Sequence, residues 1–161
     1  MPEKKTRAAA EKDKKQGKSA STQAGEYVHE EIEHVRKGKH GAKSAKQAIA
    51  IGLSKARRAG VKAPVKKTAS KSTRKKAASD EAASHTHKKT SATRSKATSK
   101  ALKKEGHSAA SKTALSRQGK KSAAKRTASS KSSAAKKAAK TKGAAGRSSA
   151  AKKAAKTRAE K

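Results

Sequence analysis

Large apolar side chains are scarce in this chain, and most of them lie in one short segment. The sequence has no Phe, Trp or Cys, and its hydrophobic fraction of 30% is mostly alanine. Of the twelve larger apolar residues, most lie between Tyr27 and Val65. Because a domain must bury apolar surface to offset the entropy of ordering its chain, we predict a mostly disordered protein with one short all-α segment at about 24–60.

Positive charge is the second constraint, and it is unevenly distributed. The 161 residues include 46 Lys and Arg against 11 Asp and Glu, which gives a formal net charge of +35. Residues 1–40 hold 10 basic and 7 acidic side chains, whereas residues 41–161 hold 36 and 4. Such a charge favours a solvated chain and calls for a polyanionic partner. We therefore expect the binding function to lie mainly after residue 40.

Two segments in the first third of the chain have helical periodicity. Val28, Ile32 and Val35 recur at i, i+4 and i+7, which predicts an amphipathic helix at about 24–37, with Gly38 as its C-terminal cap. Residues 1–23 have mixed charges and no such pattern, so we predict a charged flexible arm there.

The second helix is predicted at about 45–58. Ser44 and Gln47 have the spacing of a capping box, Gly60 suits the C-cap, and Pro64 prevents continuation. A row of Ala and apolar residues at steps of three and four, including Ile49 and Leu53, forms its apolar face. We expect the two helices to pair as an αα-hairpin, with Val28, Ile32 and Val35 facing Ile49 and Leu53. A core this small favours homo-oligomerisation or folding on a ligand.

Residues 61–161 form a low-complexity basic tail of Lys, Ala, Ser and Thr. Within it, SSAAKKAAKTK at 132–142 recurs as SSAAKKAAKTR at 148–158. In a helix, the lysines of each AAKKAAK unit would lie on one side and the alanines on the other. The repeats either become helical when phosphates neutralise the lysines or remain a solvated, never-helical polycation.

The tail segment KKAAKTKGAAGRSSAAKKAAKTR resembles the carboxyl tails of linker histones and of bacterial histone H1-like proteins. This resemblance covers about 66–161 and implies DNA binding. With Pro2 and Pro64 as the only prolines and no room for a winged-helix domain, the bacterial type fits better. Residues 25–62 resemble a small bacterial family of uncharacterised function through the segment KQAIAIGLSKARRAG, which implies no established activity.

Catalytic, cofactor and metal sites are not expected. His29, Glu30 and His34 have the order H-E-x-x-x-H, and a step of five residues turns about 140° around a helix, so the two imidazoles would not share a face. His40, His85 and His87 suggest only adventitious nickel or zinc binding. The acids Glu30, Glu31 and Glu33 have no apolar pocket to separate their pKa values, so we expect solvated carboxylates and no enzyme activity.

We therefore predict non-sequence-specific DNA binding and condensation by a nucleoid-associated protein, located in the cytoplasm on the nucleoid and without a membrane partner. RNA or ribosome association is an alternative, as is a small protein-interaction module, such as a plasmid-maintenance or stress factor, with a localising tail. Gln47 on the second helix could instead read an adenine edge in a major groove. The basic residues predicted to contact nucleic acid are Lys43, Lys46, Arg57, Arg58, Lys125, Arg126, Lys136, Lys137, Lys140, Arg147, Lys152, Lys153, Lys156 and Arg158.

Overall fold

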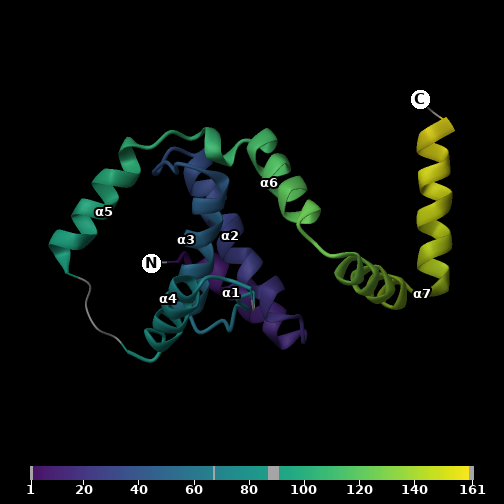
Figure 1. Cartoon of the computed structure of the whole chain (residues 1–161), viewed down its shortest axis with the longest axis horizontal. Helices are drawn as coiled ribbons and strands as arrows, with labels where there is room; N and C mark the ends of the chain where they lie inside the picture. Colours follow the sequence, from purple (N-terminus) through teal and green to yellow (C-terminus); the bar gives the residue numbers. More distant parts are fainter. Residues whose placement is uncertain (1, 67, 87–90, 160–161) are drawn as a thin grey trace. The chain divides into compact units, whose positions relative to one another are not determined.

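The computed structural model describes residues 2–66, 68–86 and 91–159, and most of them are helical. The elements are α1 (Lys4–Lys15), α2 (Ala20–Arg36), α3 (Ala45–Arg58), α4 (Lys71–Ala82), α5 (Ala92–Lys104), the short 3-10 helix η1 (Ser108–Ala110), α6 (Lys112–Ala124) and α7 (Ala128–Ala159) (Figure 1). The prediction of a mostly disordered chain is therefore wrong.

Alanine explains why the chain is ordered. It has the highest helix propensity of the amino acids, and it loses no side-chain rotamer entropy on burial. Among the residues that the structure describes, ten of the thirteen buried hydrophobic side chains are alanines. A prediction that counts only larger apolar side chains as core-formers misses this interior.

The helices α2 and α3 pack on each other, and other elements pack around them. The bounds of α3 coincide with the predicted helix at 45–58, whereas α2 begins earlier than predicted, at Ala20. Its N-cap is Ser19, whose side chain accepts a hydrogen bond from the backbone N–H of Thr22. Gly38 follows α2 with a φ of +72°, the left-handed conformation that suits a glycine after a helix.

Small residues form the buried face of α3. Ala45, Ala48, Gly52 and Ala56 follow one another at steps of three and four residues, and all are buried. A Cβ at Gly52 would lie 2.7 Å from the Cα of Val28, so the two backbones are in contact there. The larger side chains flank this contact: of Val28, Ile32, Val35, Ile49 and Leu53, Val35 is fully buried and the other four are partly exposed.

The predicted flexible arm at 1–23 contains a packed helix. Helix α1 lies against α2 and buries Ala10 in a cluster with Tyr27 and Val61. The backbone N–H of Glu3 also donates to Oε2 of Glu30 at 3.2 Å. The chain before α2 is therefore part of the folded unit.

Part of the predicted tail at 61–161 also belongs to this unit. The loop between α2 and α3 donates two backbone hydrogen bonds to the C-terminal end of α5 and the segment after it, from Gly41 to the carbonyl of Leu102 at 2.9 Å and from Ala42 to that of Gly106 at 3.0 Å. Ala109 and Ala110 of η1 are buried against Val35. Contacts divide the chain into residues 1–118 and 119–161, and each unit is described by itself.

The lysine repeats lie in α7, which is broken near its middle. Gly143 has a φ of +65° and a ψ of −179°, and this non-helical conformation separates the two repeats (Figure 1). Both repeats are helical in this structure. None of the helices among the described residues combines the length and the apolar character needed to cross a membrane.

Candidate functional site

The second unit carries a dense positive charge on its helices. Residues 119–159 contain 14 Lys and Arg and no Asp or Glu. In the repeats of α7, the basic side chains lie at i, i+1 and i+4, which places each trio on one side of its helix. The predicted residues that are exposed on α7 are Lys136, Lys137, Lys140, Lys152, Lys153, Lys156 and Arg158.

Three other predicted residues lie at or near the ends of the α7 halves. Lys125 and Arg126 are exposed in the link before α7. The guanidinium of Arg126 donates to the carbonyl of Ser130 at 3.1 Å, which holds it on the first turn. Arg147 lies in the second half of α7, and its side chain is outside the described part of the chain.

The four predicted residues at α3 are not equally accessible. Lys43 and Lys46 are exposed. Arg57 donates from Nε to the carbonyl of Ala63 at 3.3 Å, and Arg58 donates from Nε to Oδ1 of Asp80 at 2.9 Å. The two arginines therefore have structural partners within the first unit.

The side chain of Gln47 also has a structural role. Its Oε1 accepts a hydrogen bond from the backbone N–H of Lys43 at 2.9 Å, while the backbone N–H of Gln47 donates to Oγ of Ser44 at 3.3 Å. This arrangement caps α3, and it competes with any contact between the Gln47 amide and a base edge.

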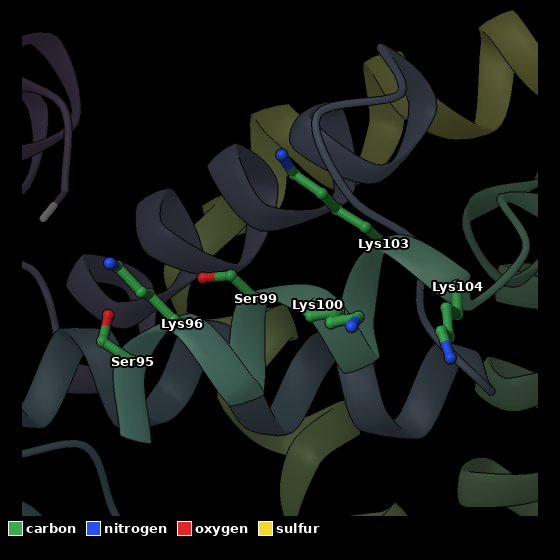
Figure 2. A pocket seen from close by; sticks show the side chains of 6 residues that line it. All are labelled: Ser95, Lys96, Ser99, Lys100, Lys103 and Lys104. Atoms are coloured by element: carbon green, nitrogen blue, oxygen red, sulfur yellow. The ribbon is translucent and has the colours of Figure 1, made fainter. Parts of the chain in front are cut away.

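Sequence reasoning did not single out the basic surface on α5. Four lysines and two serines line one side of this helix (Figure 2). These lysines contribute to the positive charge after residue 40. They do not lie in a repeat, so no sequence pattern marked them as a binding surface. They are Ser95, Lys96, Ser99, Lys100, Lys103 and Lys104.

A cluster of buried charges lies where α2 meets α3. Glu31 is fully buried and Glu30 is 5% exposed, which contradicts the expectation that these acids are solvated. Nζ of Lys55 lies 2.5 Å from Oε2 of Glu31 and 3.9 Å from Oε1 of Glu30. These contacts are ion pairs: within the described part of the chain, Oε1 of Glu30 and both carboxylate oxygens of Glu31 have no partner in hydrogen-bond geometry.

Two histidines adjoin this cluster. Nε2 of His40 lies 3.3 Å from Oε1 of Glu31, and Nε2 of His34 lies 3.8 Å from Oε1 of Glu30. The imidazole rings meet edge to face with centroids 6.1 Å apart. His29, by contrast, is exposed on α2 and is not one of the three residues whose ligand atoms lie together.

Glu3 connects the N-terminal segment to this cluster. Its Oε1 lies 2.8 Å from Nζ of Lys39 and 2.9 Å from Nε2 of His34. The hydrogen bonds from Lys39 and His34 lower the pKa of Glu3 to about 2. A hydrogen bond from Arg36 likewise lowers the pKa of Glu33 on the exposed side of α2.

The fold and these surfaces describe a basic helical protein whose first unit has a charged interior. Residues 13–67 match the protein family described as "Family of unknown function (DUF6496)". The matched segment is about a third of the chain, and it contains α2, α3 and the buried charges but none of the lysine repeats. None of the curated proteins and none of the solved structures matches this chain.

Proposed function

We propose that the protein binds nucleic acid, DNA foremost, through phosphate contacts of its lysine-rich helices, and that it acts as an architectural protein of the nucleoid rather than as an enzyme. The observation that carries this proposal is the charge of residues 119–159, with 14 basic side chains and no acidic one. A surface of one sign and this density attracts a polyanion, and the binding releases the counterions condensed on it.

The position of the lysines supports contact with phosphates rather than with bases. The lysine ammonium is a flexible point charge that can pair with phosphate oxygens in many orientations, whereas bidentate base recognition favours planar amide or guanidinium groups held in a groove. The repeats offer alanine between their lysines, and the side chain of Gln47 is engaged in a cap. Binding should therefore depend little on sequence.

The test is a salt series with matched charge variants of the full chain. In one variant, glutamine replaces the six lysines of the repeats; in the other, arginine replaces them. Glutamine removes the charge and arginine keeps it, and both have helix propensities close to that of lysine. The positions are Lys136, Lys137, Lys140, Lys152, Lys153 and Lys156.

The expected result is a linear fall of log affinity with log salt for the wild type on two unrelated duplexes. Each phosphate contact contributes about 0.9 to the slope, so the glutamine variant should lose up to about 5 from it while the arginine variant keeps it. Fluorescence anisotropy at each salt concentration gives the affinity, and the series gives the slope. An unchanged slope in the glutamine variant, or a strong preference for one duplex, would contradict the proposal.

A parallel series on RNA of the same length tests the nature of the polyanion. Equal or weaker binding to RNA is the result expected for a DNA-binding architectural protein. Much tighter binding to RNA would favour association with RNA or the ribosome instead.

A further inference from the structure

The cluster between α2 and α3 contains more negative than positive charge. Glu30 and Glu31 are both buried, and Lys55 is the basic side chain that lies between them. Buried carboxylates are costly unless they are paired and hydrogen-bonded. Among the residues that the structure describes, three of their four oxygens accept no hydrogen bond, so a further positive group would stabilise the cluster.

The hydrogen bond of His40 shows where that group must lie. Its Nδ1 is 3.1 Å from the carbonyl oxygen of Gly41, which can only accept, so Nδ1 carries a proton. In the neutral ring, Nε2 then has a free lone pair, and it faces Oε1 of Glu31 at 3.3 Å. Two acceptors repel each other at this distance unless a proton or a metal ion lies between them.

His34 is held in a similar way. Its Nε2 is 2.9 Å from Oε1 of Glu3, a carboxylate that fixes the ring on its outer side. In metal centres a ligating histidine commonly donates its other ring N–H to a carboxylate or a backbone carbonyl. His34 has a carboxylate partner in Glu3, and His40 has a backbone carbonyl partner in Gly41.

The ligand atoms are close enough to share one ion. One atom each from Glu31, His34 and His40 lies within 4.8 Å of the other two. Donors about 2.0–2.2 Å from a tetrahedral zinc ion are roughly 3.3–3.6 Å apart. The 3.3 Å between Nε2 of His40 and Oε1 of Glu31 already has this value, and the ligand atom of His34 lies within 4.8 Å of both.

We propose that Glu31, His34 and His40 bind a divalent transition-metal ion of the zinc type, with Lys55 retained on the second oxygen of Glu31. Two imidazoles and one carboxylate suit zinc, whereas magnesium and calcium require oxygen ligands. In zinc sites with three protein ligands, water or a substrate occupies the fourth position. The ion supplies the positive charge that the interior lacks and joins α2 to the loop before α3.

The test measures binding of Zn²⁺ and Co²⁺ to the full chain and to three variants. His34→Ala and His40→Ala each remove one proposed ligand. His29→Ala removes an exposed histidine of the same helix and serves as the control. Calorimetry gives the stoichiometry and affinity, and thermal unfolding gives the stabilisation by the ion. The visible spectrum of Co²⁺ reports the coordination number of the bound ion.

The expected result is one ion per chain, a rise in the unfolding temperature with Zn²⁺ but not with Mg²⁺, and a Co²⁺ spectrum typical of four-coordinate sites. His34→Ala and His40→Ala should weaken binding by at least about tenfold, and His29→Ala should not. Circular dichroism checks that each variant remains helical.

Two outcomes would overturn the proposal. The first is no saturable binding by the wild type, in which case a proton supplies the missing charge between Glu31 and His40. The second is binding that persists in both His34→Ala and His40→Ala, which would locate the ion on surface histidines. A variant that loses its helices is replaced by His40→Gln, which keeps a polar side chain in the loop.

Discussion

Gly52 determines how closely the two central helices approach, because it has no side chain at the point where α3 meets the backbone of Val28. The rest of the buried face of α3 is alanine, so this helix contributes backbone and methyl groups to the contact. An added methyl group cannot be accommodated at this contact, because its neighbours are main-chain atoms that cannot rotate away. Residue size therefore matters more here than hydrophobicity.

Gly52→Ala should destabilise the protein although alanine is the better helix former. The added Cβ would lie 2.7 Å from Cα of Val28, so the helices must separate. Overpacking costs about 1–3 kcal/mol, which exceeds the roughly 1 kcal/mol gained in helix propensity. Gly25→Ala on α2 is the matched control. It has open space around its Cβ and should stabilise by about 0.5–1 kcal/mol in chemical denaturation. Equal effects of the two substitutions would show that α2 and α3 do not touch at Gly52.

Glu3 makes the attachment of the N-terminal segment dependent on pH. Its pKa is lowered from the ordinary value of 4.5 to about 2, so its interactions stabilise the folded state above pH 4.5 and are lost as the pH falls towards 2. Glu3→Gln should therefore lower the unfolding temperature at pH 7, and the difference from the wild type should shrink to nothing near pH 2. Glu11→Gln, at an exposed pair with Lys15, should have little effect. A difference that is constant across this range would rule out the hydrogen bonds of Glu3 as its cause.

Among the elements, α3 is predicted well from sequence because its signals are local. Ser44 accepts from the backbone of Gln47, and Gly60 has a φ of +88° just after the helix, as its sequence position predicts. The helices α1 and α4 are not predicted, since neither has a periodic apolar face. Each buries one alanine and one acidic side chain instead of an apolar row: Ala10 and Asp13 on α1, and Ala77 and Asp80 on α4.

Asp80 holds α4 on α3. Its carboxylate is 3% exposed and accepts hydrogen bonds from Oγ of Ser54 at 2.6 Å and from Nε of Arg58 at 2.9 Å. Asp80→Ala should weaken this attachment by about 1.5–3 kcal/mol per lost bond to the charged group. Amide exchange should then accelerate in α4 while α2 and α3 stay protected. Glu81→Ala, at the exposed neighbouring position, is the control, and retained protection of α4 in the Asp80 variant would contradict this role.

For the whole molecule, the sequence predicts the positive charge and the repeats, but it does not predict how much of the chain is folded. The exposed lysines of α7 follow directly from their spacing. The order of the chain depends on alanines that are individually uninformative, such as Ala109 and Ala110, which are buried only because the loop after α2 meets them. The cluster of Glu31, His34 and His40 depends on a loop conformation, so the spacing of histidines along α2 gave no indication of it.

The break at Gly143 divides α7 into two helical halves, each of which carries one lysine repeat. A straight helix of sixteen residues is about 24 Å long, less than the roughly 34 Å of one turn of duplex DNA, so each half of α7 is short enough to follow the phosphates locally. The glycine conformation isolates one repeat from the next. If the protein binds nucleic acid as proposed, a tandem duplication or deletion of one repeat would change the number of phosphate contacts by a fixed increment and leave residues 1–118 intact. The copy number of the repeat would then grade the affinity for the polyanion.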